Sequence, residues 1–132
     1  MSLFTVGCKV ENPADSSKTA VVPRLLVDSG SEFTWIEETT LQRIGIEVRK
    51  KDISIQMANG QLVTRSVGFA VLYVDKPLTV DEVVFAQKGD LLILGCRALE
   101  GMNLMVDPRR KRLVAAGPVI AAAAAKSRGR IV

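Results

Sequence analysis

The most informative property of this 132-residue sequence is that it contains no histidine. Without an imidazole the chain cannot build a Ser-His-Asp triad, a Cys-His dyad or a histidine-ligated zinc site. Only two cysteines are present, far apart and outside any Cys-x-x-Cys pattern, which argues against a thiolate metal cluster or a thioredoxin-type redox motif. The chemistry that remains is that of carboxylates, of lysine or of binding alone, and we expect neither a metal nor a cofactor.

Aromatic residues and long apolar runs are also scarce. Only 5% of the residues are aromatic and the net charge is a modest +4, so few side chains could stack on bases and we expect no nucleic-acid partner. No apolar run approaches the ~20 residues needed to cross a bilayer, and the first residues lack the pattern of a signal peptide. We therefore expect a soluble, cytoplasmic protein with no membrane partner.

The length and composition predict one folded domain. A chain of this length with 48% apolar residues can bury a sizeable core without disulfides or a structural metal. No internal linker or fixed-period repeat divides it, so we expect a domain over residues 1–120. Residues 121–132 begin with five alanines and continue with basic residues, and they predict an alanine-rich basic C-terminal tail that is frayed.

Alternating apolar residues separated by turn formers predict a mostly β domain with one or two short helices. An opening hairpin is expected, with a strand over residues 4–10 and a turn over 12–17. Short helices are expected over 37–44 and 96–101. Further strands are expected over residues 25–27, 33–36, 53–57, 62–64, 67–74, 80–85, 91–94, 104–106 and 112–114.

A polar loop, Asp28-Ser29-Gly30-Ser31, follows the buried strand formed by residues 25–27. The apolar residues before it bury the approach, and Gly30 lets the backbone turn close to the carboxylate. Such an aspartate is held in place rather than mobile. Taken alone, the tripeptide Asp28-Ser29-Gly30 is weak evidence for a catalytic site, because Asp, Ser and Gly also make the commonest surface turns.

Three motifs in this order resemble those of the retropepsin-like aspartic proteases, and the resemblance covers most of the chain. The segment 26–31 is similar to the family's catalytic loop, with Asp28 as the catalytic residue and Ser29, Gly30 and Ser31 supporting it. Met57, Ala58, Asn59 and Gly60 are similar to its flap tip, and Ile93, Leu94 and Gly95 to the apolar-apolar-Gly motif before its helix. Residues 104–114 resemble the closing hairpin of cellular and bacterial relatives. The resemblance implies a closed β-barrel or sandwich with a flap hairpin.

The family's chemistry needs two carboxylates that share a proton, one to activate water and one to protonate the substrate carbonyl. Since the sequence contains one Asp-Ser-Gly, the second Asp28 must come from a second copy across a two-fold axis. The resemblance therefore implies a homodimeric aspartic endopeptidase that cleaves a peptide or protein substrate by direct water attack. The dyad is expected to titrate as a pair.

Two departures from the family's pattern concern the surroundings of Asp28. Ser31 stands where many retroviral enzymes have alanine; a hydroxyl that donates to a dyad oxygen would favour the charged form, and we expect an acidic activity optimum. An arginine commonly follows the second-motif glycine and pairs with an acid four residues beyond the catalytic aspartate. Here Glu32 supplies the acid, but Cys96 follows Gly95, so either Arg97 reaches Glu32 or the pair is absent. Cys96 is expected to pack as a small buried residue.

Several other side chains have a structural and a functional interpretation. Trp35 is expected in the core, with a substrate-pocket wall as the alternative. Met57 at the flap tip either contacts a ligand or the other subunit, or has no such role. Asp107 is expected to form a turn, and three acids are expected to be solvated loop charges: Asp81, Glu82 and Asp90. Candidate apolar subsite residues are Val27, Ile53, Leu62 and Ile93.

Two other hypotheses remain open at this point. The chain is either the protease just described or a catalytically weak module of the same fold that dimerises or binds peptides. It is also either a separate protein or one segment of a longer polyprotein or multidomain protein. A C-terminal strand that contributes to the dimer sheet is expected either within residues 114–120 or at 131–132.

Overall fold

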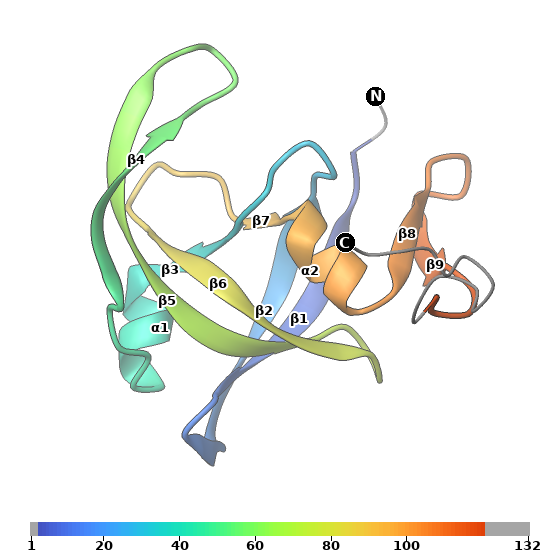
Figure 1. Cartoon of the computed structure of the whole chain (residues 1–132), viewed down its shortest axis with the longest axis horizontal. Coiled ribbons are helices and arrows are strands. Elements are labelled where there is room, and N and C mark those ends of the chain that lie inside the picture. The colour runs from blue at the N-terminus through green and yellow to red at the C-terminus, as the bar shows by residue number, and fades with distance from the viewer. Residues whose placement is uncertain (1–2, 121–132) are drawn as a thin grey trace, which may run out of the picture.

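The computed structural model describes residues 3–120 and begins with an antiparallel hairpin (Figure 1). Strand β1 (Thr5–Asn12) pairs with β2 (Asp15–Val27). Asn12 fixes the turn, because its amide nitrogen donates to the Ile44 carbonyl at 2.9 Å and its side-chain oxygen accepts the Ala14 N–H at 2.8 Å. Strand β2 ends at Val27, directly before Asp28, so the hairpin carries the candidate catalytic loop at its end.

Five further strands complete a mixed sheet with β1 and β2. They are β3 (Thr34–Glu37), β4 (Lys50–Gln56), β5 (Leu62–Tyr73), β6 (Leu78–Ala86) and β7 (Ile93–Leu94). The strand order is β1-β2-β7-β3-β6-β5-β4, and β1 also pairs with β5, so the sheet curls until it is nearly closed. Strand β7 lies between β2 and β3 and runs parallel to β2. The apolar segment before Asp28 and the apolar segment before Gly95 therefore end side by side.

Two short helices cover the sheet. Helix α1 (Glu38–Arg43) follows β3, with Glu38 in its first turn, Arg43 in its last turn and Leu41 buried. Helix α2 (Cys96–Gly101) follows β7 and buries Ala98 and Leu99. It lies so close to β6 that a Cβ on Gly101 would collide with the Thr79 side chain.

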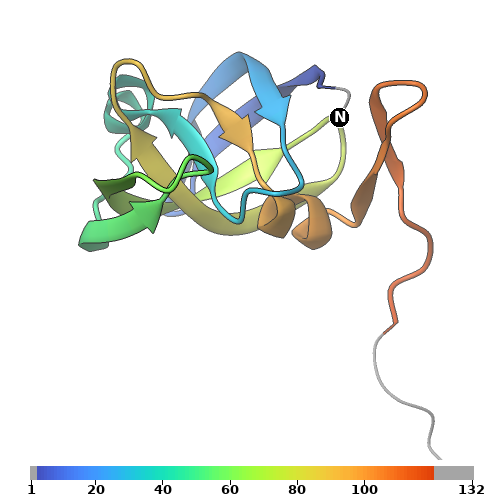
Figure 2. The ribbon, with the colours of Figure 1, turned by 90° about the horizontal axis from the view of Figure 1, so that it is seen from above.

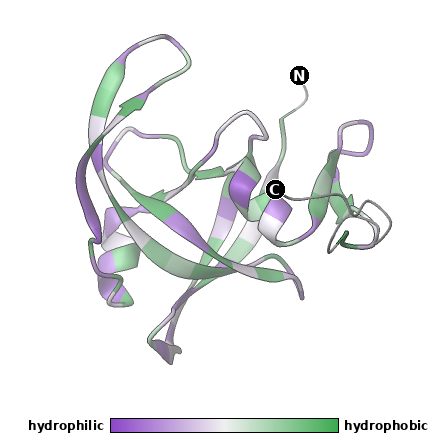
Figure 3. Cartoon of the chain, in the orientation of Figure 1, coloured by the Kyte–Doolittle hydropathy of each residue, from purple (hydrophilic) through white to green (hydrophobic). Residues whose placement is uncertain are grey.

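Apolar and polar residues alternate along many of the strands (Figure 3). The buried apolar side chains form two clusters. The larger cluster fills the barrel with side chains that include Leu25, Ile36 and Leu72, each 0% exposed. The smaller one lies on the side of the hairpin formed by β4 and β5, which we call the flap hairpin after the resemblance noted above, and we call this cluster the flap-side cluster. Its buried members are Trp35, Val67, Val84, Ala86 and Ile93.

A separate two-stranded sheet follows α2 at one end of the molecule (Figure 2). Leu104, Val106 and Leu113 of this sheet pack against the larger core cluster. Its strands are β8 (Leu104–Asp107) and β9 (Arg112–Ala115). Asp107 closes the turn between them by accepting the N–H groups of Arg109 and Arg110, both at 3.2 Å, and the Arg110 amide is the main reason why the Asp107 pKa lies below its ordinary value. Asp107 is therefore a turn former, as expected.

The mostly β architecture with two short helices and a nearly closed sheet is confirmed. Three details are wrong. The first turn contains only residues 13–14, because the polar residues that follow belong to β2, which pairs with β1. The strands expected over 62–64 and 67–74 are one continuous strand, β5, and strand β7 contains two residues rather than four. The tail, residues 121–132, and the possible strand at 131–132 lie outside the described residues. Among residues 3–120 no helix is long and apolar enough to cross a membrane.

Candidate active site

Asp28 lies at the end of β2, where the chain turns away from the sheet. Its backbone N–H donates to the Leu94 carbonyl at 3.1 Å, and its Oδ1 accepts the Gly30 N–H at 2.9 Å. A further bond from the Ser31 N–H to the Asp28 carbonyl, 3.1 Å long, closes the turn. The carboxylate is thus fixed by the backbone of its own loop. Asp28 is half-buried in the single chain, whereas Ser29 and Gly30 are exposed.

The second motif supports this loop from the neighbouring strand. Leu26 and Val27 pair in parallel register with Ile93 and Leu94. A Cβ on Gly95 would collide with the Phe33 carbonyl oxygen, so only glycine lets the catalytic loop approach this closely. The Cys96 N–H then donates to the Ser31 carbonyl at 2.6 Å, and this bond joins α2 to the catalytic loop.

Thr34 is a member of the site that the sequence analysis did not identify. Its side chain is fully buried, and its Oγ1 accepts the Gly95 N–H at 3.1 Å. It thereby satisfies a buried donor at the point where the two motifs meet. The available signal was a single hydroxyl residue inside the apolar stretch 33–36.

The Ser31 hydroxyl has a different partner from the one expected. It donates to the Phe33 carbonyl oxygen at 3.0 Å. A serine has one hydroxyl proton, so this bond contradicts the expectation that Ser31 donates to an Asp28 oxygen. In the single chain Ser31 supports the shape of the loop, and the expected acidic optimum loses this particular argument.

The flap hairpin consists of β4, β5 and the turn between them, with Met57 to Gly60 at its tip. The Met57 N–H donates to the Gln61 carbonyl at 2.8 Å, and the Gly60 N–H returns to Met57 O at 2.9 Å. Gly60 has a positive φ of 86°, which only glycine adopts readily. The Asn59 side chain accepts the Gln61 N–H at 2.9 Å, and Ala58 is exposed. The structure therefore has the hairpin turn that the Asn-Gly pair predicted.

Apolar side chains fill the space beneath the flap strands. Trp35 is only 3% exposed and belongs to the flap-side cluster, so its assignment to the core is confirmed. Met57 is half-buried and packs against the same cluster instead of projecting freely. Of the candidate subsite residues, Ile53 and Ile93 belong to this cluster or pack on it, while Leu62 is 65% exposed near the flap tip. Val27 belongs to the larger core and is not free to line a subsite in the single chain.

An ion-pair chain runs from the catalytic loop to the base of the flap. Arg97 Nη2 lies 3.3 Å from Glu32 Oε2, so Arg97 does reach the acid four residues beyond Asp28. Its Nη1 lies 3.6 Å from Glu82 Oε2, and Glu82 Oε1 lies 2.7 Å from Lys50 Nζ on β4. Cys96 is half-buried rather than fully buried, because it begins α2 at the surface of the loop.

The expectation that three acids are solvated loop charges is wrong. Asp81 and Glu82 lie on β6, and burial raises the Asp81 pKa because its Oδ2 is enclosed without a hydrogen-bond partner. Asp90 forms a bidentate pair with Arg65, with Nε to Oδ2 and Nη2 to Oδ1 both at 2.8 Å. This pair holds the Asp90 pKa below its ordinary value. Sequence alone missed the ion pairs of Glu82 and Asp90 because their partners lie on other elements of the fold.

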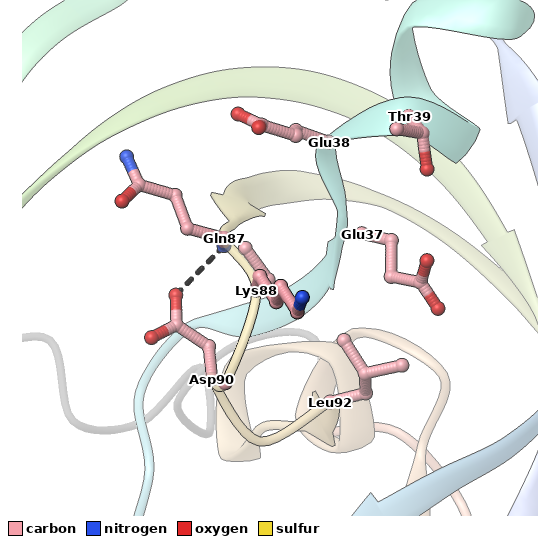
Figure 4. Close-up of a pocket in the computed structure, with 9 residues that line it drawn as sticks. Glu37, Glu38, Thr39, Gln87, Lys88, Asp90 and Leu92 are labelled. Atoms are coloured by element: carbon pink, nitrogen blue, oxygen red, sulfur yellow. Dashed lines mark hydrogen bonds between the residues drawn. The ribbon is translucent and has the colours of Figure 1, made fainter.

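A surface pocket of about 370 Å³ lies between the start of α1 and the loop over residues 87–92 (Figure 4). Glu37, Glu38 and Asp90 contribute carboxylates to its wall, and Leu92 contributes an apolar side chain. Asp28 does not line it. This pocket is thus separate from the candidate site at Asp28.

The site offers one carboxylate, fixed backbone amides and an apolar surface beneath a hairpin. Within residues 3–120 no three Cys, Asp or Glu side chains gather in a way that could hold a metal ion. A single carboxylate can act as a general base, but the acid and base needed for peptide hydrolysis require two groups.

Comparison with known proteins agrees with this arrangement. Residues 13–96 match the aspartyl protease family, a retropepsin-like family, and this match covers more than half of the chain. The chain therefore belongs to the retropepsin-like aspartyl proteases. The matched segment runs from the start of β2 to the start of α2 and includes Asp28, the flap tip and Gly95. No curated protein matches the sequence significantly.

Proposed function

We propose that this chain is an aspartic endopeptidase whose active site forms when two copies bring their Asp28 carboxylates together. The observation that carries the proposal is the fixed position of Asp28 at the junction of the two family motifs, on a loop whose next two residues are exposed. A homodimer supplies the second carboxylate and the second surface at once.

The proposed reaction uses one ionised and one protonated Asp28. The ionised carboxylate takes a proton from water while the water oxygen attacks the carbonyl carbon of the scissile peptide bond, and the protonated carboxyl gives its proton to the carbonyl oxygen. The tetrahedral diol then collapses as its C–N bond breaks. The leaving nitrogen takes the proton that the first carboxylate removed from water, and the second carboxylate recovers a proton from a diol hydroxyl. The products are a carboxylic acid and an amine, and no acyl-enzyme forms.

The proposed substrate is an extended peptide that lies beneath the flap hairpins. Its backbone would pair like an added strand, as extended peptides do at exposed strand edges. The apolar residues beneath the flap favour apolar side chains in that peptide, with Ile53, Leu62 and Ile93 as subsite candidates. Residues 1–120 are the proposed protease domain and 121–132 a tail.

The cysteines fit a reducing compartment, and we place the protein in the cytoplasm. Cys8 and Cys96 are both free. Burial raises the pKa of the Cys8 thiol to about 11, so it stays protonated and unreactive at neutral pH.

The test is cleavage of a diverse peptide mixture from about pH 3 to pH 8 by the wild type, Asp28→Asn and Asp75→Asn. Asp75→Asn is the matched control, because it removes the same charge at an exposed turn whose φ of 57° asparagine tolerates. We expect cleavage by the wild type and Asp75→Asn and none by Asp28→Asn. No cleavage by a folded wild-type dimer would favour the peptide-binding or dimerisation module, and cleavage by Asp28→Asn would show that the site is elsewhere.

A further inference from the structure

Arg65 and Asp90 form the least exposed ion pair in the part of the chain that the structure describes. Their side chains are 13% and 12% exposed, whereas the Arg97–Glu32 pair is 44% and 69% exposed. Two parallel N–H···O bonds of 2.8 Å fix the guanidinium in the plane of the carboxylate. Bidentate geometry of this kind restrains both distance and orientation, which a single lysine contact does not.

The pair joins two parts of the fold that share no strand pairing. Arg65 lies on β5, five residues after Gly60 at the flap tip, and opposite Ile53 of β4. Asp90 lies in the loop over residues 87–92, which leads into β7. Strand β5 pairs with β4, β6 and β1, while β7 pairs with β2 and β3. The ion pair is therefore a direct polar link from the flap hairpin to that loop.

Asp90 also shapes its own loop. Its Oδ2 accepts the Gln87 N–H at 2.8 Å, and its N–H donates to the Gln87 carbonyl at 2.9 Å (Figure 4). Both carboxylate oxygens are thus occupied, one by the guanidinium alone and the other by the guanidinium and a backbone amide. Any displacement of Arg65 would act on the loop as a whole.

The 87–92 loop leads into the strand that supports Asp28. After Asp90 the chain passes through Leu91, which is 63% exposed, and reaches Leu94, whose carbonyl accepts the Asp28 N–H. On the flap, Leu62 is 65% exposed three residues before Arg65. Leu62 lies close to Arg65 in the sequence, and Leu91 directly follows Asp90. The ion pair therefore restrains both segments that carry an exposed leucine.

We propose that Arg65 and Asp90 are positioning residues that hold the flap hairpin at a fixed separation from the 87–92 loop and so set the width of the peptide-binding cleft. This inference rests on the proposed function. Neither residue contacts the reacting atoms, so the pair acts on peptide binding and on the size of the side chains accepted, and not on the bond-breaking step.

The test replaces the pair with apolar side chains, Arg65→Met with Asp90→Leu. Replacement of a buried ion pair by apolar residues of similar volume often preserves or raises stability, so this variant separates positioning from folding. Hydrogen exchange of residues 50–65 and 87–92 is measured in the wild type and the variant, followed by KM and kcat on a cleaved peptide. Arg110→Met is the control, because it removes a more exposed ion pair from the separate β8–β9 sheet, outside the candidate site.

We expect exchange at the flap tip and the loop to rise by about tenfold or more in the double variant, while its denaturation midpoint is preserved. In the double variant KM should rise by about tenfold, while kcat should stay within about twofold of the wild-type value. Arg65→Lys, which keeps a positive charge beside Asp90, should raise KM by less than the double variant does. Arg110→Met should leave the exchange of these segments and KM unchanged. Unchanged exchange in a folded double variant, or a fall in kcat with constant KM, would overturn the inference. If the wild type cleaves nothing, the proposed function fails, and the exchange experiment still decides whether the pair restrains the flap.

Discussion

The backbone N–H of Asp28 donates to the carbonyl oxygen of Leu94 at 3.1 Å, and this bond ties the catalytic loop to the second motif of the chain. The two residues are far apart in the sequence and adjacent only because β7 inserts between β2 and β3. The position of the carboxylate therefore depends on the close approach of strands, and changes at their junction should disturb the site and the fold together.

Gly95→Ala should destabilise the protein by more than about 2 kcal/mol, because the new Cβ collides with a backbone carbonyl that cannot rotate away. Gly7→Ala is the matched control, since its Cβ would lie 3.6 Å from the nearest atom, an ordinary contact. The measurement is the urea midpoint at constant m-value and fixed protein concentration. Equal urea midpoints for Gly95→Ala and Gly7→Ala would show that a Cβ at residue 95 does not collide with the Phe33 carbonyl.

Thr34→Val should cost about 1–3 kcal/mol, because it leaves the buried Gly95 N–H without an acceptor while keeping the volume of the side chain. Thr34→Ser keeps the oxygen and should lose less. The same urea titration checks both variants. A valine variant as stable as the wild type would mean that the Gly95 N–H has found another partner.

Ser31→Ala should cost about 1 kcal/mol of stability through the lost bond to Phe33 and should leave the acid limb of the activity profile where it is. The hydroxyl is directed away from the carboxylate, so it cannot stabilise the ionised dyad. Activity measured against pH for both proteins tests this. A shift of the acid limb in Ser31→Ala would show that the hydroxyl turns toward Asp28 in the dimer.

The Arg65–Asp90 pair should make flap stability depend on pH at the acid end. Its hydrogen bonds lower the folded-state pKa of Asp90 from its ordinary value of 3.8, so the stability it contributes is fully present above that value and is lost as the pH falls through the lowered pKa. The protection of the flap amides against hydrogen exchange, corrected for the intrinsic pH dependence of exchange, should therefore fall only below about pH 3.8. Asp90→Asn should show fast exchange already at pH 6, and an equal pH dependence of the two proteins would refute this.

The sequence predicted the parts of the fold that depend on local chemistry. Asn59-Gly60 specifies a turn by itself, and the apolar run before Asp28 specifies a buried strand. The polar start of β2 was taken for a turn because its strand character comes from pairing with β1. Asp90 was taken for a solvated charge because its partner Arg65 lies 25 residues away in the chain, and no local pattern connects the two.

In the candidate site, too, the features that depend on local sequence were predictable and those that depend on contacts between distant segments were not. The residue types and order of the three motifs were enough to indicate the family, since each motif is contiguous. The acceptor for Gly95 and the partner of the Ser31 hydroxyl depend on how strands approach one another, and a side chain such as Thr34 acquires its role only there. The position of the second carboxylate cannot follow from any local pattern, because the proposal takes this carboxylate from a second copy of the chain.

The most direct test of the shared active site is to mix wild-type and Asp28→Asn chains and allow their subunits to exchange, with the wild-type concentration held constant and well above the dimer dissociation constant. With an equal amount of the variant, random pairing leaves half as many wild-type dimers, so a dyad made by two chains predicts that peptide cleavage falls to about half. Cleavage that stays at the level of the wild type alone would show that each chain carries a complete site, and would contradict the account.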